Sequence, residues 1–196
     1  LMNCASSHIY LKQMNRKCEL ALENGAEPVR VLSSVLGQNY PSDELEYSWK
    51  KLMQNHPHDS ICCCSVDEVQ DEMATRFNKS KQVADYLVSE GKRYIADKIN
   101  TKEYEKYKNV LPFVVFNTTG RERTSVVSVE IDVTRKSGWL KKCAYDLDEI
   151  NVPNYKLIDS DGNSIPFKIE DLGVKFGYDL PKDKVRHCLL YTSDAA

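Results

Sequence analysis

Apolar residues recur at helical spacing near the start of the chain. Over residues 6–24 they repeat every three or four positions and predict an amphipathic helix: Leu11, Met14, Cys18 and Ala21. Gly25 stands where a helix stop is expected, and a short apolar segment then follows Pro28 and ends near Gly37. The pattern therefore indicates a break in the chain between the two segments.

Another helix is predicted beyond residue 42. Asp43 and Glu46 have the spacing of a capping box, and three apolar residues lie on one face of the expected helix: Leu45, Trp49 and Leu52. Proline disfavours helical geometry in the residue before it, so this helix should end around residues 55–57. Residues 56–60 are then expected to form a turn or loop.

The longest helix is predicted to start at Ser65, whose hydroxyl would cap the first turn while Glu68 reaches back. Its apolar positions are mostly compatible with one buried stripe: Val66, Val69, Met73, Phe77, Val83, Leu87, Tyr94 and Ile99. Gly91 is the expected point of interruption. Three or four helices joined by short loops indicate a helical bundle.

Beyond a polar connector at residues 100–109 the period of the pattern changes from 3.6 to 2. A buried strand is expected at residues 113–116 and a turn at residues 117–120. Apolar and polar residues then alternate and predict a strand with one solvent-exposed face. The apolar positions of this strand are Val127, Val129, Ile131 and Val133. A hairpin is expected at residues 157–169. Helices first and strands afterwards predict an α+β fold, a helical bundle followed by the first strands of a β-sandwich-like domain.

The predicted domain boundary lies near residue 108. Residues 1–108 would form a helical domain, and residues 109–186 would start a β-domain. Residues 187–196 change character abruptly, so we interpret them as a non-native tail and leave them out of the fold prediction. Because the chain also begins almost within a helical pattern, we interpret it as a fragment of a longer protein.

Composition and charge argue against several classes of function. The 196 residues include 27 Lys and Arg against 29 Asp and Glu, so no basic excess exists for binding nucleic acid. The longest apolar stretch, residues 113–116, is far too short to span a membrane. Seven irregularly spaced cysteines, three of them consecutive, favour reduced thiols in a cytoplasmic protein.

Reactive side chains are densest at residues 55–65, between two predicted helix ends. The segment holds His56, His58, Asp59 and three thiols, and zinc prefers imidazole and carboxylate among its ligands. Histidines before a helix are also often hydrogen-bonded caps, and small cysteines such as Cys62–Cys64 more often pack a tight turn. From the residues alone, a metal or catalytic role and a structural role both stay open.

The run from Trp49 to Val69, WKKLMQNHPHDSICCCSVDEV, closely resembles the bacterial-type α-mannosidases of glycoside hydrolase family 38. In that family the pattern WxxLMxNHPHDSICGCSxDxVHxEM opens the long helix after the active-site loop. The earlier SSHIYLKQ, from residue 6, is similar to the family's SSRxYLKQ helix. FVVFN at residues 113–117 is similar to the strand that begins its β-domain, so the resemblance covers roughly residues 3–135.

The resemblance implies retaining hydrolysis of α-mannosides in oligosaccharides, with one zinc ion that binds two sugar hydroxyls. The family's zinc-binding histidine falls on His58, and the aspartate that hydrogen-bonds sugar hydroxyls falls on Asp59. Two roles stay open for His56, a partner that supports a ligand of the site or a purely structural residue, and we expect the latter. The nucleophilic aspartate and the remaining zinc ligands, including a His-x-Asp pair, would lie upstream, so the fragment alone should be inactive. The family's large β-domains also imply that a full-length protein can form homo-oligomers.

Three positions depart from the family pattern. Cys63 replaces the glycine of ICGC, and if that backbone has a positive φ the change costs about 1 kcal/mol or more. Gln70 replaces a histidine, and the glutamine side chain can still form hydrogen bonds but cannot gain or lose a proton. His8 replaces an arginine, so the always charged guanidinium and its planar set of N–H donors are lost.

Two further functions compete with the mannosidase interpretation. The alternative is a non-catalytic helical module that binds carbohydrate or a partner, with His58 as a helix-end cap and the cysteines buried. A small free-standing metal-binding protein is the third possibility.

Overall fold

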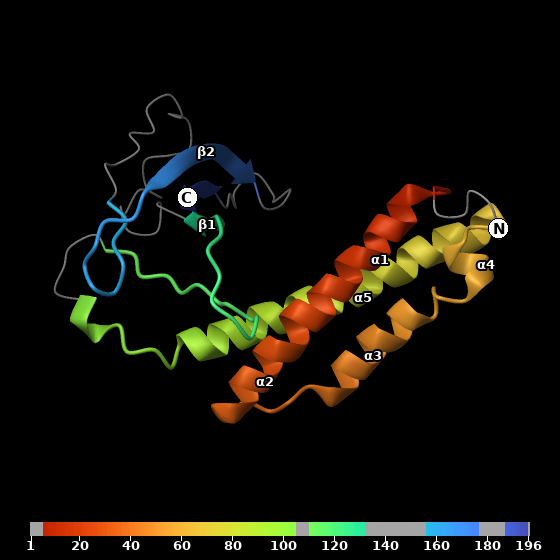
Figure 1. The fold of residues 1–196 in the computed structure, drawn as a ribbon, viewed down its shortest axis with the longest axis horizontal. Coiled ribbons are helices and arrows are strands. Elements are labelled where there is room, and N and C mark those ends of the chain that lie inside the picture. The colour runs from red at the N-terminus through yellow and green to blue at the C-terminus, as the bar shows by residue number, and fades with distance from the viewer. Residues whose placement is uncertain (1–5, 105–109, 132–155, 177–186, 196) are drawn as a thin grey trace, which may run out of the picture. The chain divides into compact units, whose positions relative to one another are not determined.

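The computed structural model describes residues 6–104, 110–131, 156–176 and 187–195 (Figure 1). Its contacts divide the chain into two compact units, Leu1–Arg121 and Glu122–Ala196. Helices make up the first unit, and three strands lie in the second. The predicted α+β fold, a helical bundle followed by strands, is therefore confirmed. The boundary proposed near residue 108 stays a prediction.

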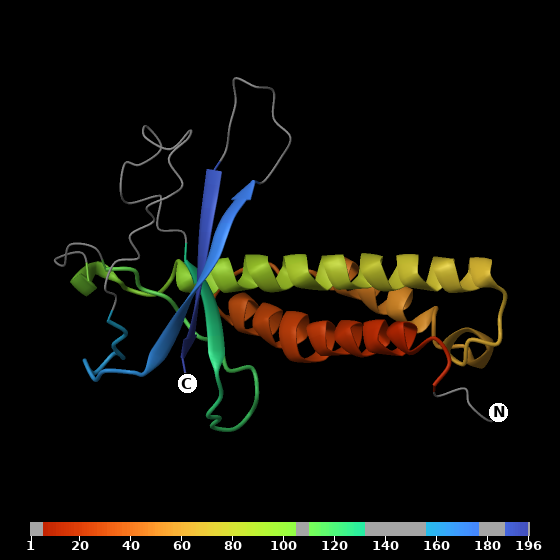
Figure 2. The same ribbon diagram turned by 90° about the horizontal axis from the view of Figure 1, so that it is seen from above.

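The helical unit is built around one long helix. Figure 1 shows the α1–α2 pair crossing α5, and Figure 2 shows the pair running alongside α5, consistent with the contacts that α1, α2 and α3 each make with α5. The α-helices of the described residues are α1 (Ile9–Ala21), α2 (Glu27–Val35), α3 (Ser42–Met53), α4 (His58–Ile61) and α5 (Asp67–Ala96). A short 3-10 helix, η2 (Lys102–Tyr104), follows. Among the described residues, no helix combines the length and apolar character needed to cross a membrane.

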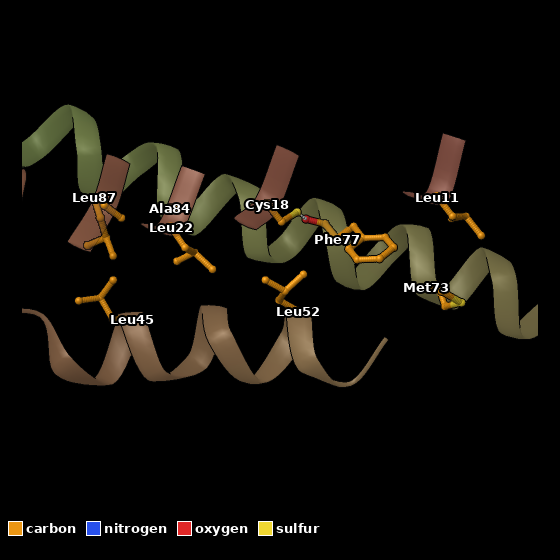
Figure 3. Packing of buried hydrophobic residues seen from close by; sticks show 10 residues of the cluster. Leu11, Cys18, Leu22, Leu45, Leu52, Met73, Phe77, Ala84 and Leu87 are labelled. Atoms are coloured by element: carbon orange, nitrogen blue, oxygen red, sulfur yellow. Dashed lines mark hydrogen bonds between the residues drawn. The ribbon is translucent and has the colours of Figure 1, made fainter. Parts of the chain in front are cut away.

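The core of the unit lies where α1, α3 and α5 meet. Buried side chains from these helices, and from the turn that follows α1, face one another in Figure 3: Leu11, Cys18, Leu22, Leu45, Leu52, Met73, Phe77, Ala84 and Leu87. Each large aliphatic or aromatic side chain removed from water contributes roughly 1.5–3 kcal/mol. Burial raises the pKa of the Cys18 thiol, which donates a hydrogen bond to the Phe77 carbonyl at 3.2 Å.

Residues 9–35 form one continuous rod, so the predicted break at Gly25 was wrong. A π-helical turn, η1 (Leu22–Ala26), joins α1 to α2, and the Glu27 amide donates to the Leu22 carbonyl. Pro28 has no amide hydrogen for the Asn24 carbonyl four residues earlier. That carbonyl accepts instead from the Thr118 hydroxyl at 2.7 Å. The wider turn therefore accommodates the proline without ending the helix.

Neither predicted capping box forms. Helix α3 starts directly after Pro41 with no side-chain cap, and Asp43 lies inside its first turn. Helix α5 starts after Val66, two residues later than predicted, also without a side-chain cap. The hydroxyl of Ser65 is instead buried with no hydrogen-bond partner among the described residues. Asp67 lies in the first turn of α5, where its charge complements the helix dipole.

Helix α5 continues through Gly91 rather than being interrupted there. Gly91 is buried against α2, and a Cβ at this position would lie 2.6 Å from Val29 Cγ1. The glycine thus permits a close approach of two helices. Val66 and Ile99, predicted on the buried stripe, are exposed and lie outside the helix. The buried positions of α5 include polar and small residues: Gln70, Met73, Phe77, Ser80, Ala84, Leu87 and Gly91.

The strands of the second unit form an antiparallel sheet in the order β1-β3-β2. Strand β1 (Val127–Ile131) confirms the predicted alternating segment, and Val133 lies outside the described residues. Strand β2 (Phe167–Phe176) carries a register shift between Asp171 and Val174. Residues 187–195 form β3, although the sequence analysis left them out of the fold. Their non-native origin stays a prediction.

Two turn predictions are confirmed and one strand prediction is wrong. The Ile165 amide donates to the Leu157 carbonyl at 3.0 Å, which closes a small hairpin. At residues 117–120, the Asn117 side chain accepts from the Thr119 amide at 3.1 Å. Residues 113–116, expected as a buried strand, have no strand assignment, and Val115 is 55% exposed. An apolar run becomes a strand only when another strand pairs with it.

Candidate functional site

His58 and Asp59, the predicted site residues, begin the single helical turn α4. The sequence analysis expected a turn or loop at residues 56–60, but residues 58–61 are helical. Pro57 precedes the helix, and its carbonyl accepts from the amides of Ser60 and Ile61 at 2.9 and 3.0 Å. A proline disfavours helix in the residue before it but not in the residues after it, so α4 starts there.

The side chains of His58 and Asp59 lie beside each other in solvent. His58 Nε2 is 3.2 Å from Asp59 Oδ1, and the two side chains are 83% and 74% exposed. An ion pair so accessible to water contributes little to stability. The cap role considered for His58 is not observed, because the residue preceding α4 is Pro57 and α4 has no side-chain cap. The side chain of His58 therefore does not cap α4, and Asp59 lies in the first turn of this helix.

Helix α4 ends in a Schellman motif. The Cys63 amide donates to the Ser60 carbonyl at 2.9 Å, and the Cys64 amide donates to the Asp59 carbonyl at 3.2 Å. Cys63 has φ +59°, the left-handed conformation that this motif requires and that glycine adopts most easily. The second hydrogen bond ties the backbone of Asp59 to the turn, so the turn and the candidate site are one local structure.

We call residues 54–66 the site segment. Helix α5 fixes both of its flanks. The side chain of Asn55 is fully buried and donates to the Met73 carbonyl at 3.0 Å. At the other flank, Gln70 Nε2 donates to the Ser65 carbonyl at 3.0 Å. Sequence reasoning missed Asn55 as a support, although its place in the NHPHD run marked it as a polar residue beside a predicted helix end.

Helix α1 contacts the site segment on either side of α4. His56 Nε2 lies 2.8 Å from Asn15 Oδ1, and Lys12 Nζ donates to Cys63 Sγ at 3.2 Å. Lys12 and Asn15 are three residues apart and therefore on one face of α1. No signal in the sequence pointed to these pairs, since 41 and 51 residues separate the partners.

The donor atoms of His58 and Asp59 fit part of a zinc site. An imidazole nitrogen and a carboxylate oxygen lie side by side and open to solvent, and both are ligand types that zinc accepts. Zinc sites usually need at least three protein ligands. Within the parts of the chain that the structure describes, no group of three or more His, Cys, Asp or Glu side chains is placed to hold a metal ion. Further ligands would have to come from elsewhere.

Two family profiles match consecutive parts of this chain. The profile described as "Alpha mannosidase middle domain" matches residues 2–95, and "Glycosyl hydrolases family 38 C-terminal domain 1" matches residues 108–192. The chain belongs to glycoside hydrolase family 38. The site segment lies within the part matched by the middle-domain profile, and β1 and β2 lie within the part matched by the C-terminal profile.

Individual relatives within family 38 agree with the profiles. A protein of Halalkalibacterium halodurans named "Putative mannosylglycerate hydrolase" is 40% identical over 95% of this chain and 21% of its own length. A crystal structure of a family 38 protein from Enterococcus faecalis matches with a TM-score of 0.83 and 38% identity, over 98% of this chain and 23% of that one. An α-mannosidase structure from Enterococcus faecalis V583 matches with a TM-score of 0.75 and 38% identity, over 98% and 22%. The chain thus spans about a fifth of the length of these relatives.

The departures from the family 38 pattern have different consequences in the structure. Gln70 is buried and keeps a hydrogen bond within the helix start, as expected. His8, in place of arginine, is exposed at the start of α1, where its Nδ1 lies 3.0 Å from Ser7 Oγ. Cys63 has the positive φ on which its expected cost depended.

The three consecutive cysteines are not buried as a group. Cys62 and Cys63 are half-buried, and Cys64 is exposed. The expectation of small buried thiols that pack a tight turn was therefore only partly right: none of the three is fully buried, but backbone hydrogen bonds close a tight turn and Cys63 packs against the core. The side chain of Cys63 accepts from Lys12, and its thiol faces the Ile61 carbonyl at 3.7 Å.

Proposed function

We propose that this chain is the middle part of a zinc-dependent retaining α-mannosidase of the cytoplasm, a glycoside hydrolase whose remaining segments complete the active site. The observation that supports the proposal best is the placement of His58 and Asp59. Both lie on α4, exposed and 3.2 Å apart, within the segment that carries the family 38 pattern. The matching profiles for the middle and C-terminal domains support the same class of enzyme.

In this proposal the two side chains have separate tasks. The imidazole of His58 serves as one zinc ligand, and the carboxylate of Asp59 accepts hydrogen bonds from sugar hydroxyls beside the metal. Zinc bound there would supply a positive template that holds two hydroxyls of the sugar and helps to distort its ring. The role of this chain is then to bind and orient the mannose. The nucleophilic aspartate and the other ligands belong to residues outside it.

The proposed substrate is a terminal α-mannosyl group of an oligosaccharide. One relative is named a mannosylglycerate hydrolase and another an α-mannosidase, and the mannosyl group is what these two names share. In the proposed site the zinc ion and Asp59 bind hydroxyls of the sugar rather than the leaving group, so the site would recognise this shared mannosyl group.

Three variants of the longer protein that carries this chain test the proposal. His58→Ala should lose bound zinc and lower kcat/KM for an aryl α-mannoside by at least about 100-fold, because a ligand is removed. Asp59→Asn should lower kcat/KM by about 10- to 100-fold while the zinc is kept, since the carboxylate acts on the sugar. Asp67→Asn, an exposed carboxylate at the start of α5, is the matched control.

Zinc content is measured by elemental analysis and folding by circular dichroism. His58→Ala protein that folds, keeps its zinc and turns over normally would remove the proposal and favour a non-catalytic helical module. The 196-residue chain alone should show no turnover of the same substrate, because a single imidazole and a single carboxylate do not hold a zinc ion.

A further inference from the structure

The contacts of helix α1 with the site segment extend the proposed function. On α1, Asn15 Nδ2 donates to Glu19 Oε1 at 2.7 Å, and Arg16 Nη1 pairs with Glu19 Oε2 at 3.2 Å. With its amide nitrogen used in this way, Asn15 presents its Oδ1 to His56. Because an amide oxygen only accepts, His56 Nε2 must carry the proton in this contact. The hydrogen bond therefore selects both the orientation of the asparagine and the tautomer of the histidine.

His56 stands at the junction between two helices. Its amide donates to the Met53 carbonyl at 3.0 Å, in the last turn of α3, and the next residue is Pro57, which directly precedes α4. Proline fixes its own φ and restricts the residue before it, so the position of His56 constrains that of His58, two residues later. A contact that anchors the His56 ring to α1 thereby limits where His58 and Asp59 can lie.

The far end of α4 is tied to the same face of α1. Lys12 Nζ donates to Cys63 Sγ at 3.2 Å and to the Ser7 carbonyl at 2.5 Å. The helical turn that carries His58 is thus bracketed by two polar contacts to α1, one before and one after it. Groups hydrogen-bonded directly to a metal ligand typically change metal affinity about 10- to 100-fold, and because these contacts constrain only the backbone on either side of His58, we expect the lower end of that range, about tenfold.

We propose that Asn15 and His56 are positioning residues for the zinc ligand His58 and for Asp59. They act through one hydrogen bond, between His56 Nε2–H and Asn15 Oδ1, that anchors the junction of α3 and α4 to α1. This inference rests on the proposed function, and for His56 it selects the supporting role that the sequence analysis left open over the structural role that it expected.

The test measures the zinc dissociation constant of the longer protein by competition with a chelator. His56→Phe and Asn15→Leu should each raise the constant about tenfold, and the double variant should raise it no further, because both remove the same hydrogen bond. His56→Gln keeps an N–H donor and should return the constant to within about threefold. Gln13→Ala, an exposed position on the same helix, is the matched control.

Thermal unfolding is recorded for every variant. Loss of a merely structural contact would lower the midpoint of thermal unfolding without changing the zinc dissociation constant. Unchanged zinc binding in His56→Phe and Asn15→Leu, additive losses in the double variant, or no rescue by His56→Gln would each overturn the inference. The variant His58→Ala distinguishes a failure of this inference from a failure of the proposed function. If that variant loses zinc while His56→Phe keeps full affinity, only the positioning role fails, and if His58→Ala keeps zinc, the proposed function fails.

Discussion

Gly37 and Cys63 occupy the same position in two Schellman motifs, one at the end of α2 and one at the end of α4. In each motif the residue donates its amide to the carbonyl three residues earlier, and the next amide donates to the carbonyl five residues before it. The φ angles are +98° for Gly37 and +59° for Cys63. One motif therefore has the residue that this backbone favours, and the other carries a side chain that the left-handed region disfavours.

Cys63→Gly is predicted to stabilise the 196-residue chain by about 1 kcal/mol, because it relieves the left-handed strain of an L-residue. The lost contact between Lys12 and the sulfur and the lost packing of Cys63 against the core offset part of this gain, so about 1 kcal/mol is its upper value. The free energy of unfolding measured in urea checks the prediction. Gly37→Ala, the reverse change in the matching motif, should destabilise by a similar amount, and a loss of stability in Cys63→Gly would contradict the strain argument.

Gly91→Ala is predicted to destabilise the helical unit by about 1–2 kcal/mol. Alanine favours a helix over glycine by about 1 kcal/mol, but its Cβ would meet the stiff, fully buried Val29 side chain at 2.6 Å, and overpacking typically costs 1–3 kcal/mol. Val29→Ala should then cost less in the Gly91→Ala background than in the unaltered chain. Equal costs in both backgrounds would show that the two residues do not collide.

The matched control for the Gly91 change is Gly120→Ala. Among the residues that the structure describes, no heavy atom outside the immediate chain neighbours lies within 4 Å of a Cβ placed at Gly120. The free energy of unfolding of this variant should stay within about 0.5 kcal/mol of the unaltered chain, as for most exposed positions.

Tyr40 is predicted to ionise late in an alkaline titration. Its hydroxyl donates to Glu27 Oε2 at 2.5 Å, and this hydrogen bond, then burial and the carboxylate charge, raises the pKa of Tyr40 to about 12. A pKa raised above the unfolded value of about 10 contributes stability that is complete below pH 10 and lost as the pH rises through 12. The stability difference between the unaltered chain and Tyr40→Phe should therefore shrink across that interval.

Tyrosinate absorbance and urea unfolding at several pH values measure this effect. Tyr40→Phe should remove one late-titrating tyrosine, and Glu27→Gln should shift that tyrosine back toward about pH 10, because the acceptor loses its charge. Tyr86→Phe, at an exposed position on α5, should leave the late phase in place. Persistence of the late phase in Tyr40→Phe would assign it to another tyrosine.

The sequence was sufficient to predict the three longest of the described helices, α1, α3 and α5, but not their ends. Periodicity located α1, α3 and α5, because burial of one face produces the pattern directly. The break expected at Gly25 failed because the acceptor freed by Pro28 finds its partner in Thr118, 94 residues beyond Asn24. Ser65 was expected to be a cap, yet α5 starts two residues later. Helix ends depend on such distant or competing partners, which local patterns do not contain.

The candidate site, like the helices, could be predicted only in part from the sequence. The family resemblance singled out His58 and Asp59, which lie side by side on α4, and it anticipated the cost of a positive φ at Cys63. Their roles toward zinc and sugar stay proposals. The supports contributed by Asn15 and Lys12 could not be predicted, because they depend on how α1 packs beside the site segment. The strand expected at residues 113–116 failed for a related reason, since strand formation needs a pairing partner.

The π turn between α1 and α2 also predicts a pattern in alignments of related chains. A π turn is one residue longer than the α turn it replaces, so it absorbs one inserted residue without unwinding the rod. A relative with a single-residue gap between positions 22 and 26 would form a regular helix there, and each carbonyl would then need an amide donor four residues later. The residue aligned with Pro28 would be that donor, so a relative with both the gap and the proline would need a hydroxyl such as that of Thr118 at the freed carbonyl.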